Sequence, residues 1–375
     1  MGKVMPDWNK FNQETLDFLL SIAPGNPESK VKLSKNPLPW PKSWCPLRWD
    51  KGRIWDFFKY GGLWRAEDVF KEPLSEVFVK EDGTPKKFVE IGTVPNREKK
   101  HLAIGVTDVE HARALIYVND REQIYFEDHP LLRVLLYDEK NPAWEPLAGS
   151  ASIPLFFSIV NTLGGQWIND GGTVNYLPSS WMREGSKAVQ LAVSCIDLEL
   201  PRHNAWPGTN KYKFKNIFSL IENIVYSSLI SIAQSDMNAF YEGGNQDYCI
   251  FEYKEISDKM STTSFNELNV KNVTIAFNLG LKKGRNSINN LPDKDKVRAF
   301  EQGFMIAFSG GGTLFPAMFG YGCGAAEAAW NLKAPYDVER LGLKKGDPMN
   351  AVAKAFIGGS GGGLASAYLA EKLPV

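Results

Sequence analysis

Three glycine-rich segments, far apart in the chain, limit its possible fold more than any other feature. They read Asp170-Gly171-Gly172, Ser309-Gly310-Gly311-Gly312 and Gly358-Gly359-Ser360-Gly361-Gly362. The third fits the G-x-S-x-G nucleophile elbow, a sharp turn from a strand into a helix that exposes a serine. Its flanks agree, because residues 352–357 are mostly apolar and predict a strand, whereas residues 364–372 predict a helix. Glycines suit such a turn, since a Cβ would collide with neighbouring chain or substrate.

The second glycine segment lies inside residues 302–326, a stretch of 25 residues without charge. Such a stretch is long enough to cross a bilayer. It contains seven glycines and Pro316, however, and divides naturally into a strand at 303–308, a glycine turn and a helix at 315–330. A buried strand-turn-helix unit is favoured over a transmembrane helix.

The rest of the chain alternates between predicted strands and helices. Short apolar runs predict strands at 101–107, 114–118, 123–126 and 188–196, and helical spacing of apolar residues predicts a helix at 214–234. Residues 283–295, rich in Asn, Asp and Lys, predict a surface loop. This alternation indicates an α/β protein with a central, mostly parallel sheet. Residues 1–65 hold six tryptophans and a cluster of prolines, which suggests an aromatic-rich cap or lid, although a core position for these aromatics is favoured.

Composition excludes several classes of function. The 375 residues include 43 Lys and Arg against 43 Asp and Glu, so no global basic field points to nucleic acid. The four cysteines are scattered, without the spacing of a metal site or a disulfide framework. The N-terminal residues lack the apolar run of a signal peptide. We therefore expect a cytoplasmic protein that binds no metal and no cofactor; its oligomeric state is open.

The chemistry of a catalytic serine decides which partners Ser360 needs. A serine hydroxyl requires a base to accept its proton and donors to stabilise the oxyanion. The usual Ser-Asp-His order fails, because no histidine follows His203. A Ser-Asp dyad with Asp170 as the base remains, with the amides of Gly310, Gly311 and Gly312 as the oxyanion hole. The alternatives are a helix-capping serine in a phosphate-binding loop and an ordinary Asp-Gly turn at Asp170.

These blocks resemble the patatin-like phospholipases and related cytosolic phospholipases. In that family an SGGG oxyanion loop, a G-x-S-G-G elbow and a D-G-G turn with the dyad aspartate form one site. Residues 306–312, 356–362 and 170–178 are similar to these blocks, and residues 150–157 resemble the segment before the aspartate. The resemblance implies a three-layer α/β/α hydrolase over residues 1–375 with a Ser360–Asp170 dyad.

Two departures from the family pattern affect this interpretation. The family runs SGGG, elbow, DGG, whereas here the DGG block comes first, as in a circular permutation with the usual start moved to about residue 300. Thr313 and Leu314 follow the glycine triplet where the family often has an arginine, which leaves the head-group preference open. A catalytically inactive lipid-binding or structural protein on the same scaffold is the alternative, and an interaction module at 87–126 a weaker one.

Large apolar side chains surround both glycine blocks and predict the substrate. They are Phe304, Phe308, Leu314, Phe315, Phe319, Phe356, Ile357, Leu364 and Tyr368. Each buried methylene contributes about 0.8 kcal/mol, so these residues predict a pocket for a long acyl chain. The sequence therefore predicts a lipid acyl hydrolase of phospholipase A or lysophospholipase type. It would meet its substrate at a membrane or micelle interface as a peripheral membrane protein, with residues 1–65 as the expected contact or lid.

Overall fold

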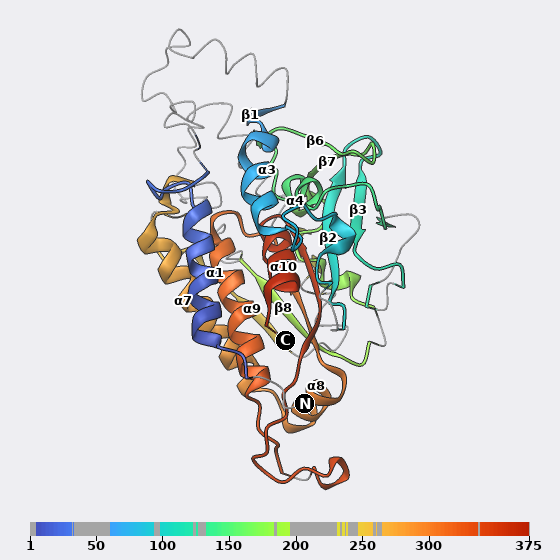
Figure 1. The fold of residues 1–375 in the computed structure, drawn as a ribbon, viewed down its shortest axis with the longest axis vertical. Helices are drawn as coiled ribbons and strands as arrows, with labels where there is room; N and C mark the ends of the chain where they lie inside the picture. Colours follow the sequence, from blue (N-terminus) through green and yellow to red (C-terminus); the bar gives the residue numbers. More distant parts are fainter. Residues whose placement is uncertain are drawn as a thin grey trace, which may run out of the picture.

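The computed structural model describes residues 5–31, 33, 61–93, 98–122, 125–126, 133–183, 186–195, 231–232, 235–236, 238, 247–257, 260, 265–336 and 338–374. A nine-stranded sheet forms its centre (Figure 1). Five parallel strands lie in the order β2 (His101–Asp108), β11 (Ala353–Gly359), β10 (Phe304–Phe308), β8 (Val189–Ser194) and β9 (Asp247–Ile250). The predicted α/β class with a mostly parallel central sheet is confirmed.

Four further strands extend the sheet beside β2. The antiparallel partner β3 (Arg113–Val118) is followed by β4 (Arg133–Leu136), which runs parallel to β3. The hairpin of β6 (Val160–Asn161) and β7 (Trp167–Asp170) joins the other side of β2, beyond the end of β11. A separate two-stranded sheet pairs β1 (Gly62–Trp64) with β5 (Leu155–Phe157).

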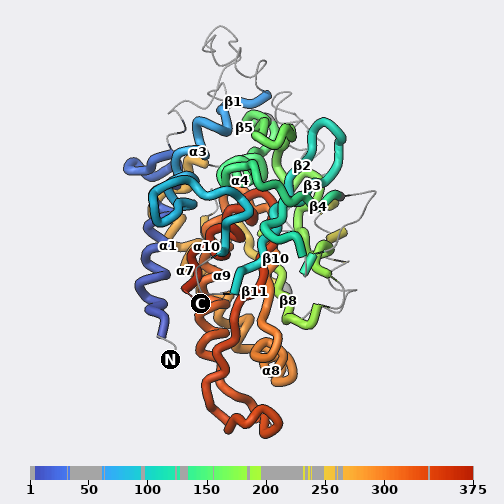
Figure 2. Tube along the Cα trace, turned by 45° about the vertical axis from the view of Figure 1, so that its right-hand side comes forward, coloured from blue at the N-terminus to red at the C-terminus, as the bar shows by residue number. Residues whose placement is uncertain are grey.

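The seven described α-helices pack into the core on one face of the sheet. They are α1 (Trp8–Ile22), α3 (Ala66–Val77), α4 (Trp144–Ser150), α7 (Val270–Asn289), α8 (Asp293–Gln302), α9 (Phe315–Trp330) and α10 (Gly361–Lys372). Ile104, Phe308 and Phe356 point from the sheet into the core beneath this layer. On the opposite face, Trp181 and Leu177 cover Ala103, Ala307 and Ile357. In both views α3 and β1 lie at one end of the molecule and α8 at the other (Figure 1, Figure 2).

Short 3-10 helices connect these elements. They are η2 (Phe88–Glu90), η3 (Gly171–Thr173), η4 (Pro178–Trp181), η5 (Tyr253–Glu255), η6 (Phe265–Glu267), η7 (Gly312–Leu314) and η8 (Glu339–Leu341). Two of them lie at the candidate site. The helix η3 begins directly after Asp170, and η7 begins at Gly312.

Glycines allow α7 and α9 to touch backbone to backbone. A Cβ on Gly280 would overlap the carbonyl of Ala317, and one on Gly320 would overlap the carbonyl of Phe277. Gly284 and Gly324 repeat this contact one turn further along. The glycines of α9 therefore serve helix packing.

Most predicted elements near the glycine blocks are confirmed. The strand at 303–308 is β10, the helix at 315–330 is α9, and the elbow strand and helix are β11 and α10. No helix in the described part of the chain is long and apolar enough to span a membrane. The runs at 101–107, 114–118 and 188–196 are β2, β3 and β8.

Two local predictions differ from the structure. Residues 283–295 are not a surface loop, because α7 continues to Asn289 and α8 begins at Asp293. The polar residues there lie on the outward side of a helix that buries Gly284 and Ile288 on the other side. At 123–126, Phe126 makes only an isolated bridge to Met182, and residues 123–124 are outside the described part.

Several predictions fall on residues outside the described part. These are the helix at 214–234 apart from a few residues, and most of the proposed cap, including four of its six tryptophans. Of the cap residues that are described, Trp8 is buried and Trp64 packs on Phe157 with ring centroids 5.7 Å apart. A short connection between Met1 and Val375, which the permutation requires, also concerns residues outside the described part.

Candidate active site

Ser360 stands at a strained turn between β11 and α10. Its backbone has φ 54° and ψ −132°, a region that residues with a Cβ rarely adopt. Strain of this kind at a serine between a strand and a helix is typical of a nucleophile elbow. Neighbouring glycines permit the turn: a Cβ at Gly358 would overlap the carbonyl of Gly362, and one at Gly362 that of Ser309. The backbone geometry therefore agrees with the elbow predicted from the sequence.

The register of β2 brings Asp170 to the elbow. Gly105 of β2 pairs with Gly359, the residue before Ser360. The next residue of β2, Val106, pairs with Asp170 of β7. The hairpin thus takes the place beside β2 that β11 leaves when it turns into α10. A Cβ built on Gly172 would lie 3.7 Å from the Ser360 Cβ, so the DGG turn closes on the serine.

The carboxyl group of Asp170 is buried, with 4% of the residue exposed. Its Oδ1 accepts a hydrogen bond from the Gly172 N–H at 2.7 Å, whereas Oδ2 has no hydrogen-bond partner among the described residues. Desolvation raises the pKa of Asp170 to about 7, although the nearby Ser360 hydroxyl and the Gly172 N–H act to lower it. The Ser360 hydroxyl is close enough to lower the pKa of the carboxyl group, but it donates no hydrogen bond to Oδ2. One oxygen therefore remains available to accept a proton near neutral pH.

The glycine triplet lies against the same serine. A Cβ on Gly310 would come within 3.4 Å of the Ser360 Cβ. The Gly310 N–H donates to the Tyr176 carbonyl at 2.8 Å, so this amide is not available to an oxyanion, in contrast to the prediction. In contrast, the N–H groups of Gly311 and Gly312 donate to no backbone carbonyl in the turns and loops of the described residues. Gly312, at φ +45°, also lines the pocket in front of Ser360.

Two residues of the site received no role in the sequence analysis. Gly361 begins α10 and lines the pocket beside Ser360. The residue after an elbow nucleophile usually supplies an oxyanion donor, so the motif itself carries the signal that was missed. Ser150 is fully buried; its hydroxyl accepts from the Ser360 N–H at 3.0 Å and donates to the Gly105 carbonyl at 2.7 Å. No sequence pattern marks that bridge.

The empty space of the pocket amounts to about 660 Å³ when the open solvent at its mouth is included. Ser360 and Gly312 lie in its wall, and most of the remaining wall is apolar, including Val69, Phe70, Ile153, Phe157, Phe315 and Leu364. Of the nine apolar residues predicted to form an acyl pocket, only Phe315 and Leu364 line it. Phe304, Phe308 and Phe356 are instead buried between sheet and helices, since side chains of central strands fill the core. An apolar pocket exists, but other segments build it.

The alternative interpretations of both residues can be compared with this geometry. The Ser360 side chain makes no capping hydrogen bond to α10, which disfavours a purely capping role. Asp170 does cap η3 through Oδ1, as an Asp-Gly turn would, but its second oxygen has no such role. Within the described ranges, no group of three or more His, Cys, Asp or Glu residues could hold a metal ion.

Comparison with known proteins adds no relative: no protein-family model, curated protein or solved structure matches the chain.

Proposed function

We propose that the protein is a serine carboxylic-ester hydrolase that uses a Ser360–Asp170 dyad. The observation that supports this most directly is the register of β2, which aligns Gly359 and Asp170 with consecutive residues. A strained serine, a buried carboxyl group with a raised pKa and an apolar pocket thereby meet at one edge of the sheet. The same convergence supports membership of the patatin-like hydrolases with the blocks in permuted order.

In the proposed reaction, the Ser360 Oγ attacks the ester carbonyl carbon while its proton passes to Asp170. The amides of Gly311, Gly312 and Gly361 stabilise the oxyanion. Collapse of this intermediate expels the alcohol, which takes the proton from Asp170, and leaves an acyl-serine. Water then attacks the acyl group, Asp170 accepts the proton of that water, and the released serine is protonated again. A base with a pKa near 7 suits both proton transfers at neutral pH.

The proposed substrate is a lipid acyl ester: a phospholipid, a lysophospholipid or an acylglycerol. The apolar wall of the pocket supports a long acyl chain, because a polar acyl group would leave its hydrogen-bonding groups unpaired there. A phospholipase A or lysophospholipase reaction at a lipid surface follows from this chemistry. We place the protein in the cytoplasm as a peripheral enzyme, a setting in which free thiols such as Cys195 and Cys323 are stable.

Chromogenic esters of increasing acyl length test the proposal. The full-length protein should cleave long acyl esters with a higher kcat/KM than acetyl esters, and Ser360→Ala should abolish turnover. The matched control is Ser186→Ala. Among the described residues, the Ser186 hydroxyl donates a hydrogen bond only to the Met305 sulfur. A long-chain alkylphosphonate p-nitrophenyl ester should label Ser360 covalently, because the serine Oγ displaces p-nitrophenolate from phosphorus; peptide mass spectrometry locates the label. Hydrolysis that survives in Ser360→Ala would refute the mechanism.

A lipid-binding protein without catalysis is the second candidate. Two observations favour it. Oδ2 of Asp170 accepts no hydrogen bond from Ser360, and the Gly310 N–H already donates to the Tyr176 carbonyl. Tight binding of a fatty acid in the pocket with no ester turnover and no phosphonate labelling would establish this alternative.

A further inference from the structure

Three apolar side chains are exposed at the tips of two neighbouring turns. Leu163 is 70% exposed and Trp167 50% exposed in the β6–β7 hairpin, and Val109 is 40% exposed in the turn between β2 and β3. The Val109 N–H donates to the Trp167 carbonyl at 2.9 Å, so the two turns adjoin. We call Val109, Leu163 and Trp167 the apolar tip. Single exposed apolar residues are common, whereas a group on adjoining turns indicates an interaction surface.

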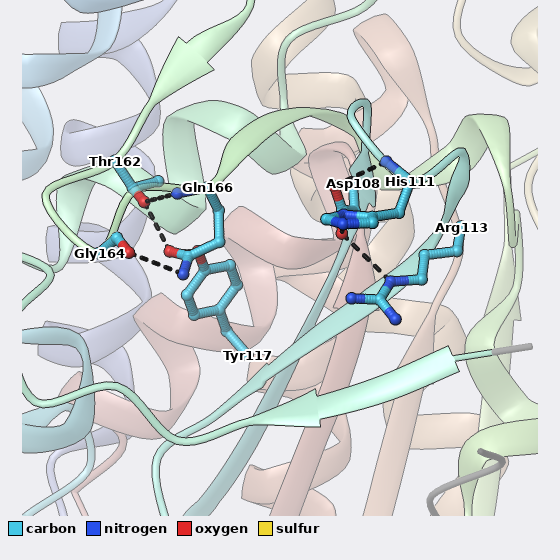
Figure 3. A network of polar contacts seen from close by, with 7 residues as sticks. All are labelled: Asp108, His111, Arg113, Tyr117, Thr162, Gly164 and Gln166. Carbon is cyan, nitrogen blue, oxygen red and sulfur yellow. Dashed lines mark hydrogen bonds and ion pairs between the residues drawn. The ribbon is translucent and has the colours of Figure 1, made fainter. Parts of the chain in front are cut away.

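Buried polar groups fix the turn that presents Leu163. The Leu163 N–H donates to Glu145 Oε2 at 2.8 Å, and the Gly164 N–H donates to Asn141 Oδ1 at 2.7 Å. Glu145 and Asn141 are both buried. Figure 3 shows the adjoining contacts, in which Gln166 Oε1 accepts from the Thr162 hydroxyl at 2.7 Å and the Tyr117 hydroxyl at 3.1 Å. The exposure of Leu163 is therefore held by the fold.

The second turn is fixed in a similar way. Asp108 is buried and pairs with Nδ1 of His111 at 2.9 Å and with Nε of Arg113 at 3.2 Å (Figure 3). It also accepts a hydrogen bond from the His111 backbone N–H at 3.3 Å. These contacts hold the turn from which Val109 projects, so hydrogen bonds fix both halves of the apolar tip.

The apolar tip is continuous with the proposed active site. Trp167 and Asp170 are the first and last residues of β7, about 10 Å apart along an extended strand. The Leu163 turn is bonded to Glu145 of α4, and the pocket wall includes Val69 of α3. Figure 1 shows α3, α4 and the β6–β7 hairpin at the same end of the molecule. A surface that contacts the apolar tip would thus lie beside the catalytic residues.

We infer that the apolar tip inserts into the surface of a neutral or zwitterionic lipid layer. Tryptophan and leucine are the side chains that suit this boundary, because an apolar body enters the acyl region while the indole N–H stays near the head groups. Between residues 108 and 113 the charged side chains are Asp108, Glu110 and Arg113, and residues 161–167 carry no charge. Since the tip has no excess of basic residues, insertion and not attraction to anionic lipid provides the binding.

The inference rests on the proposed function for its choice of a lipid partner, so its test separates binding from catalysis. The full chain carrying Ser360→Ala is sedimented with phosphatidylcholine vesicles. Adding Leu163→Ser and Trp167→Thr should reduce the vesicle-bound fraction at least about tenfold, because the inserting groups are lost. The matched control carries Phe300→Gln and Tyr336→Ser, two exposed aromatic residues in α8 and in the loop before β11. It should bind as the parent does.

The remaining measurements decide between this partner and others. Raising the salt concentration or adding anionic phosphatidylserine should leave binding unchanged within about twofold. A variant that carries the two tip substitutions but retains Ser360 should keep the wild-type kcat on a soluble, monomeric ester. Vesicle binding that survives the tip substitutions overturns the inference, as does equal loss in the control. A tip variant that binds vesicles normally but changes from dimer to monomer in sedimentation would assign the tip to self-association instead. Vesicle binding without ester hydrolysis by the wild type would refute the proposed function and leave the surface standing.

Discussion

The Ser150 hydroxyl accepts a hydrogen bond from the Ser360 backbone N–H at 3.0 Å. Because the same hydroxyl donates to the Gly105 carbonyl at 2.7 Å, it ties the elbow to the strand that also pairs with Asp170. Ser150 touches no reacting atom in the proposed mechanism and is a positioning residue. Its effect should appear in the orientation of the nucleophile.

Ser150→Ala should lower kcat roughly tenfold or more with little change in KM, because the strained backbone of Ser360 loses its support. Ser152→Ala is the control, since that serine is equally buried and, among the described residues, its hydroxyl bonds only to the Ala148 carbonyl. Steady-state kinetics on a soluble ester give both constants. A Ser150→Ala enzyme with the kcat of Ser152→Ala would show that the bridge has no positioning role.

Activity should depend on the protonation of Asp170. A general base works only when deprotonated, and burial raises the pKa of this carboxyl to about 7. The kcat/KM of the wild type should therefore fall as the pH decreases through about 7, in proportion to the unprotonated fraction. A pH profile on a substrate without ionisable groups measures this. A plateau that extends down to pH 5 would contradict the raised pKa.

Asp170→Asn should reduce kcat by roughly three orders of magnitude, by analogy with loss of a triad partner. It should also stabilise the fold at alkaline pH. The folded-state pKa lies above the value of 3.8 for an unperturbed carboxyl, so the wild type loses stability as the pH rises from about 4 to about 7. The full shift corresponds to about 4 kcal/mol, which asparagine avoids while its oxygen still accepts from Gly172.

Thermal unfolding at two pH values tests the stability part. The variant should have a higher Tm than the wild type at pH 8 and a nearly equal Tm at pH 4. The opposite order at pH 8 would mean that the carboxylate is better solvated than its burial indicates.

The pocket wall should set the preferred acyl length. Ile153→Trp places a larger side chain in the wall and should raise KM for long acyl esters roughly tenfold, with little effect on butyryl esters. Ile275→Phe, an enlargement on α7 away from the pocket, controls for general disturbance of the core. An unchanged chain-length profile in Ile153→Trp would place the acyl chain elsewhere.

Local sequence signals predicted the parts of the site that depend on neighbouring residues. The glycine pattern around Ser360 requires a turn that few other residues permit, so strand, elbow and helix were all predictable. Likewise, β10 and α9 follow from the glycine turn between two apolar segments. In contrast, α7 was not predicted, and its last turns were interpreted as a loop because its exposed side is rich in Lys and Asn.

The long-range arrangement was not predictable in the same way. The pairing of Asp170 with Val106 joins residues that no local pattern connects. The pocket wall unites residues near 31, 69, 153 and 265 with the elbow, and the sequence around the elbow carries no trace of them. Residue chemistry indicated that Asp170 and Ser360 belong together, but their alignment depends on strand order, which local propensity does not determine.

The order of the strands has a consequence for synthesis on the ribosome. The strands β10 and β11 lie between β2 and β8, yet both follow them in the chain. A nascent chain that has reached residue 300 therefore holds two part-sheets, with β2 and β8 each lacking the neighbour that will later separate them. Unpaired edges of this kind invite association with other chains, so delayed insertion of the central strands makes chaperone protection valuable. The proposed nucleophile, Ser360, directly follows the last of these strands, so the proposed mechanism predicts no lipid hydrolysis by a partly synthesised chain.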